Sequence, residues 1–210
     1  KYNDRSNIVD LYTSEFGRCA ALVNLSKSPK SKVKSNLFQP LALLDLNLSK
    51  TNKASLFRIK DVKPVHVFNS IPFHPFKSSI AFYIAEFLCF ALKDEEENFS
   101  LFTYIESSLV WFDASPSSCA NFHLVFLMRL SLFLGVYPNY EDYHPGQYFD
   151  LLAACFTSTK PYHANYLSAE ESAAIVNLMR MNYETMHLFK FSRQDRSRVL
   201  EILNEFYKIH

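Results

Sequence analysis

Leu37–Leu48 reads L-F-Q-P-L-A-L-L-D-L-N-L, and its last five residues alternate strictly between apolar and polar. The alternating residues are Leu44, Asp45, Leu46, Asn47 and Leu48. A period of two puts the leucines on one face of a β-strand and the polar side chains on the other. Pro40 lacks a backbone N–H, so it shifts the start of the run to a sheet edge or a bulge. The stretch therefore predicts a half-buried strand.

Neighbouring segments repeat this pattern. Ile8–Tyr12 and Arg18–Leu25 are short apolar runs joined by a turn at Ser14–Gly17. In Ser55–Val62, apolar and basic residues alternate at positions 57 to 60. Short strands separated by polar turns are typical of a small closed barrel.

From residue 78 onward the period changes to that of helices. The expected helices are Ser78–Lys93, Phe99–Phe112, Ala120–Leu134, one capped at Ser168 and one starting at Ser192. Ser168 and Glu171 have the spacing of a capping box. The proline-containing stretch Lys63–Lys77 joins the two parts. We therefore predict an α+β chain with a barrel domain at 1–65 and a helical domain at 66–210, of which 66–77 is a linker.

Charge divides the chain in the same place. Lys1–Lys77 carries 13 Lys and Arg against 5 Asp and Glu, whereas Ser78–His210 carries 9 against 16. These halves have net charges of +8 and −7, which the total of +1 conceals. A basic half beside an acidic half is typical of a protein with one surface for a polyanion and another for a different partner.

The densest group of cations lies in Ser26–Asn36, which we call the lysine loop and which contains no acid. Such a loop can neutralise phosphates without reading base sequence, although it could instead serve only solubility. Phe38 and Phe57 are candidates for base stacking, with a place in the core as the alternative. The predicted DNA-binding residues are Arg18, Lys27, Lys30, Lys32, Lys34, Lys53, Arg58 and Lys60.

Arg129 interrupts an otherwise apolar helical stretch. A charge there must reach solvent, pair with an acid such as Glu86 or Asp113, or serve a ligand. The last possibility predicts a pocket for a partner's carboxylate. Its apolar walls would be Phe126, Leu130 and Phe133.

Several functions lack their sequence signatures. The chain has three glycines and no phosphate-binding glycine motif, and its four cysteines form no C-x-x-C pair. No Ser/His/Asp or Cys/His arrangement stands out, although a dispersed one would not show in a sequence. We expect no catalytic residues, metal or cofactor, no membrane span, and a reducing cytoplasm as the location.

The segments also match a known family in their order along the chain. The matching stretches are Y-T-S-E-F-G-R (Tyr12–Arg18), the lysine loop, N-L-F-Q-P-L-A-L-L-D-L (Asn36–Leu46), R-I-K-D-V-K-P (Arg58–Pro64), K-S-S-I-A-F-Y-I-A-E-F-L (Lys77–Leu88), A-N-F-H-L-V-F-L-M-R-L-S-L-F-L-G-V-Y-P (Ala120–Pro138), Y-F-D-L (Tyr148–Leu151), Y-L-S-A-E-E-S (Tyr166–Ser172) and the last helix. Together they resemble RecO, the bacterial recombination mediator, in its Bacteroidetes-type branch.

The resemblance implies an N-terminal OB-fold barrel joined to an all-helical domain, without ATP use. It implies binding of single- and double-stranded DNA and annealing of complementary strands. It also implies that the chain works with RecR, binds the acidic tail of the single-stranded DNA-binding protein SSB, and helps RecA load onto covered DNA near the nucleoid. In this reading, Arg129 holds the carboxylate of the SSB tail.

Two departures from the family pattern give further expectations. Family members begin with another strand, so we expect the first strand of the barrel to be missing from this sequence. Some relatives carry paired C-x-x-C zinc ligands where Glu141–Pro161 has only Cys155. We expect no zinc there, and expect packing of Tyr143, Tyr148 and Phe149 to stabilise the region.

Two rival functions fit the same residues. The chain could be a scaffold that binds only proteins, with its lysines serving solubility, or an enzyme with dispersed catalytic residues. DNA binding that weakens steeply with salt would separate a DNA-binding protein from both.

Overall fold

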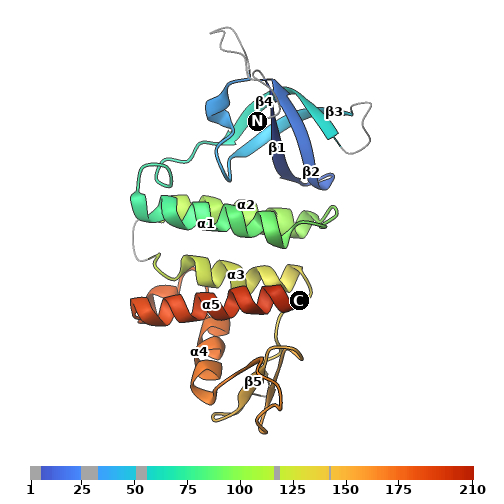
Figure 1. The fold of residues 1–210 in the computed structure, drawn as a ribbon. Coiled ribbons are helices and arrows are strands. Elements are labelled where there is room, and N and C mark those ends of the chain that lie inside the picture. The colour runs from blue at the N-terminus through green and yellow to red at the C-terminus, as the bar shows by residue number, and fades with distance from the viewer. Residues whose placement is uncertain (1–5, 25–32, 51–55, 116–118, 142) are drawn as a thin grey trace. The chain divides into compact units, whose positions relative to one another are not determined.

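The computed structural model describes residues 6–24, 33–50, 56–115, 119–141 and 143–210 (Figure 1). By its internal contacts the chain divides into two compact units, Lys1–Ala114 and Ser115–His210. Among the described residues, the first unit holds a four-stranded sheet and two α-helices, and the second holds three α-helices and a small sheet. The α+β class predicted from the sequence is confirmed. The domain boundary at 65/66 stays a prediction.

The sheet of the first unit contains β1 (Ser6–Thr13), β2 (Gly17–Asn24), β3 (Leu43–Lys50) and β4 (Leu56–His66) in the order β1-β2-β4-β3. β1 and β2 form an antiparallel hairpin, β2 runs parallel to β4, and β3 is antiparallel to β4. Within the described residues, no pairing joins β1 to β3. The described strands therefore form an open sheet rather than the closed barrel that we expected.

The inner face of this sheet confirms the alternation in the sequence. Ala21 and Val23 of β2 and Ile59 and Val62 of β4 are buried and form the core of the sheet. The leucines at 44, 46 and 48 pack against them, while Asp45 and Asn47 are exposed. One buried face is what gives a strand its period of two.

Two strand boundaries differ from the expectation, both around prolines. A 3-10 turn at Ser35–Leu37 precedes β3, which begins only after Pro40. β4 continues to His66 and includes Pro64, in what we took as the linker. β2 pairs with β4 only at Leu56–Arg58, so at Pro64 the edge of β4 that faces away from β3 has no partner strand among the described residues. A proline is tolerated there because no backbone N–H has to be donated on that side.

Helices α1 (Pro75–Ala91) and α2 (Phe99–Ala114) complete the first unit. Asp113, near the end of α2, accepts hydrogen bonds from the backbone N–H groups of Asn69, Ser70 and Ile71 at 2.8–2.9 Å. Burial opposes the charge on Asp113, but these bonds and the nearby Lys77 outweigh it and lower the pKa of the carboxyl. The chain that enters α1 is thus fastened to the end of α2.

Lys77 is buried because the end of α2 gives it acceptors. Its Nζ donates to the carbonyl oxygens of Phe112 at 2.7 Å and Asp113 at 3.0 Å. A cation at a helix C-terminus satisfies carbonyls that have no partner within the helix and complements the helix dipole.

The β1–β2 turn lies against the loop between α1 and α2. Gly17 has a φ of +60°, and a Cβ there would overlap the backbone of Glu96. The backbone N–H of Arg18 donates to the carbonyl of Glu95 at 3.0 Å. Residue 17 must therefore be a glycine for two reasons: its φ is positive, and a side chain would overlap the backbone of Glu96.

The second unit packs α3 (Phe122–Phe133), α4 (Ala169–Arg180) and α5 (Arg193–Ile209) together. The capping box predicted at Ser168 and Glu171 is confirmed, and Ser192 and Asp195 form a second one at the start of α5. Glu171 also pairs with Arg198 of α5 at 2.7 Å.

A three-stranded sheet in the second unit corrects the expectation of an all-helical domain. It contains β5 (Tyr148–Asp150), β6 (Cys155–Thr157) and β7 (Tyr166–Leu167) in the order β6-β5-β7. Strands of two or three residues are too short to show a period in the sequence. The expected aromatic packing is present, since Tyr143 and Phe149 both contact the ring of Phe156 at centroid distances of 4.8 and 4.9 Å.

Candidate nucleic-acid interface

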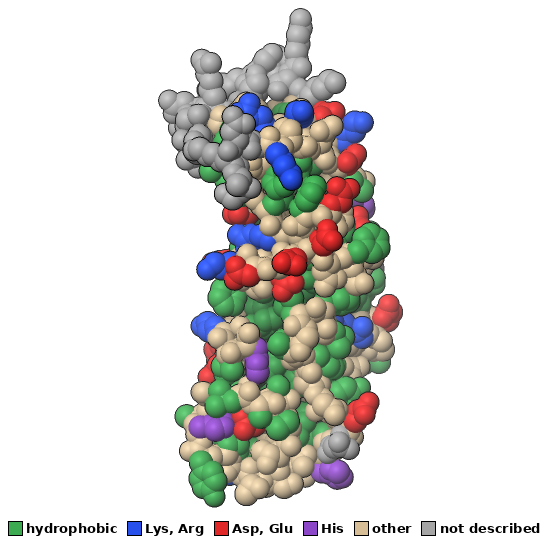
Figure 2. All heavy atoms as spheres, turned by 90° about the vertical axis from the view of Figure 1, so that its right-hand side faces the viewer, with side chains coloured by type: hydrophobic (Ala, Val, Ile, Leu, Met, Phe, Trp, Pro, Cys, Tyr) green, Lys and Arg blue, Asp and Glu red, His purple; other side chains and the backbone are tan. Residues whose placement is uncertain are grey.

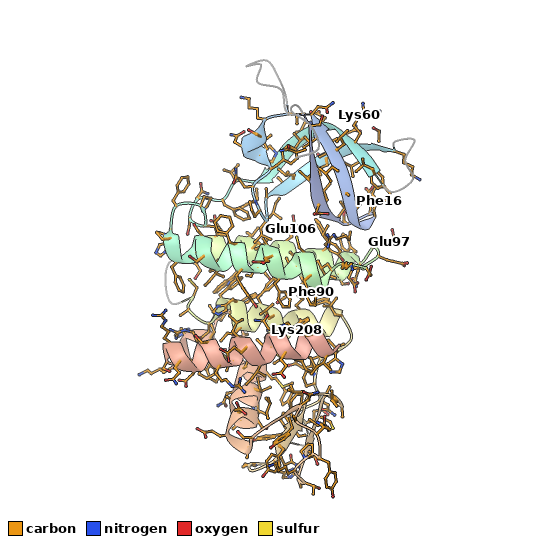
Figure 3. The ribbon with its side chains drawn as sticks, viewed as in Figure 1. Phe16, Lys60, Phe90, Glu97, Glu106 and Lys208 are labelled. Atoms are coloured by element: carbon orange, nitrogen blue, oxygen red, sulfur yellow. The ribbon has the colours of Figure 1, made fainter. Side chains whose placement is uncertain are left out.

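Two of the predicted DNA-binding cations stand exposed on the outer face of β4. Arg58 and Lys60 flank Ile59, which points into the core and is 6% exposed. Figure 3 labels Lys60 on the sheet. The strand period that buries Ile59 therefore turns both cations to the opposite face.

The cross-strand neighbours of Arg58 carry no charge. In register, Arg58 lies beside Leu22 of β2 and Ser49 of β3. Lys60 falls at the irregularity where Asn47 pairs with Asp61 and Leu48 pairs with Ile59, so it has no directly opposed residue. A bulge of this kind re-aims the side chain of the extra residue.

Other exposed cations belong to the same sheet region. Lys34 precedes the 3-10 turn, Lys50 ends β3, and Lys63 lies in β4. Lys63 pairs in register with Asp45, so an acidic residue lies directly opposite it in the sheet. Lys50 and Lys63 were not among the predicted binding residues, Lys63 because we read it as linker. On the face drawn in Figure 2, Lys and Arg side chains stand among acidic ones.

The side chain of Arg18 is held by contacts within the first unit. Its guanidinium donates to the carbonyl of Cys89 at 2.6 Å and to the carboxylate of Asp10 at 3.3 Å. The side chain is 22% exposed. Arg18 therefore joins the hairpin to α1, and its predicted role in DNA binding finds no added support here.

Four of the predicted lysines, Lys27, Lys30, Lys32 and Lys53, lie outside the described residues. Phe38 and Phe57 are half-buried and pack against the core of the sheet, which favours the core alternative over base stacking. Phe16 lies 5.1 Å from Phe57 between ring centroids and is 45% exposed.

Arg129 of α3 is half-buried and donates to the carbonyl oxygen of Met181 at 3.3 Å. Its Nε atom is buried without a hydrogen-bond partner. Phe126 and Leu130 are fully buried, and Phe133 is half-buried. Of the proposed pocket walls, only Phe133 reaches the surface beside Arg129.

Burial displaces the pKa values of Tyr12 and His123 strongly. Burial, assisted by the carboxylate of Glu95, raises the pKa of Tyr12 to about 12. Burial, assisted by Arg196, lowers the pKa of His123 to about 4. His123 is therefore a neutral core residue at physiological pH, as its place on an apolar helix indicates.

Within the described ranges, no three His, Cys, Asp or Glu side chains are grouped to hold a metal ion. None of the helices in the part of the chain that the structure describes is long and apolar enough to cross a membrane.

The fold and the basic sheet define an α+β chain with a cationic strand domain followed by a mainly helical part. A family model described as "Recombination protein O N terminal" matches residues 1–68, and "Recombination protein O C terminal" matches residues 72–210. The chain therefore belongs to the recombination protein O (RecO) family, whose N-terminal domain is of the OB type.

Curated relatives match over the whole chain. The chain is similar to "DNA repair protein RecO" of Bacteroides fragilis, with 54% identity over 211 residues, and of Phocaeicola vulgatus, with 52% over 209 residues. It is 32% identical to the protein of the same name in Flavobacterium psychrophilum. Each match covers 100% of this chain and 87% of the relative.

Proposed function

We propose that this chain is a recombination mediator and DNA-annealing protein in recombinational repair. It binds single- and double-stranded DNA through its basic sheet domain. With RecR, it helps load RecA onto DNA covered by SSB. Its relatives carry the name "DNA repair protein RecO", which supports this role.

The single observation that carries the DNA-binding part is the exposed pair Arg58 and Lys60. Both stand on the outer face of β4, and neither has an acid directly opposite in the sheet. Cations held this way neutralise phosphates and release counterions, which gives affinity without sequence preference. Lys34, which is exposed and precedes the 3-10 turn, adds a further cation to this domain.

Annealing follows from the same electrostatics. Two complementary strands repel each other through their phosphates, and a cationic surface that holds both lowers this repulsion. Pairing then proceeds by base complementarity alone. The protein contributes charge and proximity, so the reaction needs no bond-breaking step.

The test is a salt titration of DNA binding by the whole chain. Arg58→Ala/Lys60→Ala should flatten the slope of log K against log salt by about 1.4 for single strands, at about 0.7 per phosphate contact. The control variant, Lys93→Ala/Lys208→Ala, removes the same charge from exposed positions outside the sheet and should leave the slope unchanged. Figure 3 labels Lys208 on α5.

The outcome separates the proposal from its rival. A scaffold that binds only proteins shows weak DNA binding with equal small effects in both double variants. Equal slopes for wild type and Arg58→Ala/Lys60→Ala would remove the β4 cations from the binding site.

The proposed site for the SSB tail lies on α3. Arg129 can offer its guanidinium to a terminal carboxylate at the edge of the apolar surface, with Phe133 beside it and Phe126 and Leu130 as support beneath. Titration of a labelled tail peptide against wild type, Arg129→Ala and the exposed control Arg198→Ala tests this. Equal affinity in all three proteins would make Arg129 purely structural.

A further inference from the structure

The small sheet of the second unit, labelled at β5 in Figure 1, has two faces of different character. Phe149 of β5 and Leu167 of β7 are buried and pair in register, so they share one face. On that face, Phe149 lies 6.3 Å from the ring of Phe206 in α5 between centroids. Because side chains alternate along a strand, Tyr148 of β5 and Tyr166 of β7 lie on the opposite face.

This opposite face combines two aromatic rings with a cation, and we call Tyr148, Tyr166 and Lys160 the tyrosine face. The two rings lie 5.8 Å apart between centroids in an edge-to-face arrangement, and both are half-buried. The Nζ atom of Lys160, an exposed residue, lies 5.3 Å from the centroid of the Tyr166 ring. Aromatic rings that are partly exposed can stack with a planar ligand.

The one acid of this sheet is satisfied by local donors. Asp150 is the only Asp or Glu between residues 143 and 168, and its place in β5 puts it on the same face as Tyr148. Its carboxylate accepts hydrogen bonds from the backbone N–H groups of Leu152 at 2.9 Å and Ala153 at 3.1 Å. It also lies 3.1 Å from Nε2 of His163. A negatively charged ligand therefore meets Lys160 without an unpaired carboxylate from this stretch of chain.

Single-stranded nucleic acid fits this set of groups best. Its unpaired bases stack on aromatic side chains, and its phosphates are neutralised by a neighbouring cation. An acidic peptide would use the cation but not the ring faces. A duplex hides its bases in its own stack, so it would use Lys160 alone.

We propose that the tyrosine face is a second binding site for single-stranded DNA, in which bases stack on Tyr148 and Tyr166 and Lys160 neutralises a phosphate. This inference rests on the proposed DNA-binding function and extends it to the second unit, because the cations of β4 belong to the first. Two sites on one chain hold their ligands at a high local concentration. Two complementary strands held in this way are favourably placed for annealing.

The first experiment compares the affinity of the whole chain for a single-stranded oligonucleotide and for a duplex at constant salt. Tyr148→Leu/Tyr166→Leu should weaken single-strand binding at least about tenfold, because two stacking partners are lost. Duplex binding should not change. Tyr148→Phe/Tyr166→Phe keeps both rings and should bind as wild type does. Equal single-strand affinity in wild type and the leucine variant overturns the proposal.

Two controls show whether stacking is the cause. Phe99→Leu removes an exposed aromatic ring from the first unit and should leave single-strand affinity unchanged. An oligonucleotide of abasic nucleotides keeps its phosphates but has nothing to stack, so wild type and the leucine variant should bind it equally. A weaker leucine variant with the abasic strand would contradict stacking.

The second experiment tests the cation without disturbing the sheet. Lys160→Gln should flatten the slope of log K against log salt for single strands by about 0.7, the contribution of one phosphate contact. The matched control Lys208→Gln, at an exposed position of α5, should leave the slope unchanged. An equal slope in Lys160→Gln and wild type removes Lys160 from the site.

The results separate this inference from the function on which it rests. If wild type binds neither single strands nor duplex, the proposed DNA-binding function fails, and the second site fails with it. If wild type binds both and the leucine, Lys160→Gln and control variants bind as it does, DNA binding stands and the tyrosine face is not part of it. Cooperative thermal unfolding of the leucine variant shows that its loss of affinity is not a loss of fold. If that variant does not unfold cooperatively, Lys160→Gln decides, because its side chain is exposed and the sheet keeps its packing.

Discussion

Two of the glycines, one from each unit, have a backbone conformation that other residues rarely adopt. Gly17 and Gly135 both have positive φ, at +60° and +73°. Only Gly17 also meets another backbone, that of Glu96, whereas the space around Gly135 is open within 4 Å. A comparison of these two glycines therefore separates the cost of a positive φ from the cost of steric overlap.

Gly17→Ala should therefore destabilise the protein more than Gly135→Ala. An L-residue in the left-handed region costs about 1–2 kcal/mol, which both variants incur. The overlap with Glu96 adds about 1–3 kcal/mol at Gly17 alone, because the 94–97 loop must move. Denaturant unfolding of the two variants measures the difference. Equal losses would show that this loop yields freely.

Arg18 shows the limit of sequence reasoning at this scale. Its charge and its place in the basic half made it a candidate for DNA binding. Its acceptor at Cys89 is 71 residues away in the chain, so nothing in the local sequence reveals it. Arg58 and Lys60 could be placed correctly on an exposed face, because their strand alternates with buried residues.

Among the helices and strands, the length of an element determines whether it can be predicted from the sequence. The eight-residue β3 and the long helices carry enough periods to be read directly. Strands β5 to β7 have two or three residues each and were missed. The irregularity that frees Lys60 depends on pairing between β3 and β4, which no single segment encodes.

The fastening of α1 to α2 through Asp113 gives an element-scale prediction. Asp113→Ala leaves the N–H groups of Asn69, Ser70 and Ile71 without their acceptor. An unsatisfied buried donor costs about 1–3 kcal/mol, so the free energy of unfolding should fall by at least about 3 kcal/mol. Thermal and denaturant unfolding measure this loss.

Asp113→Asn is the matched control. It keeps Oδ1 for Ser70 and Ile71 but presents an NH₂ group to the N–H of Asn69, so its loss should be intermediate. Lys77 keeps its main-chain acceptors in both variants. An alanine variant as stable as the asparagine variant would contradict the role of these bonds.

In the whole molecule, the division of charge between the two halves of the chain is the feature that links the fold to the proposed function. The basic half coincides with the open sheet, and the acidic half begins within α1. A polyanion is thus drawn to the strand domain and repelled by most of the remaining chain. We therefore expect a molecule of net charge +1 to bind DNA through the local positive charge of this domain rather than through its total charge.

The lysine loop provides the test of this separation. Replacing Lys27, Lys30, Lys32 and Lys34 together with Ala should flatten the dependence of log K on log salt for single-stranded DNA. Wild type should give a slope near −3 to −4 if about four to six phosphates are neutralised, at about −0.7 per contact. The quadruple variant should lose most of that slope.

A matched variant that loses Lys93, Lys190, Arg193 and Lys208 has the same net charge but keeps the loop. If net charge alone governed binding, both quadruple variants would weaken it equally. If the loop contacts phosphate, only its own variant changes the slope, and an unchanged slope in that variant would exclude the loop from the DNA-binding surface.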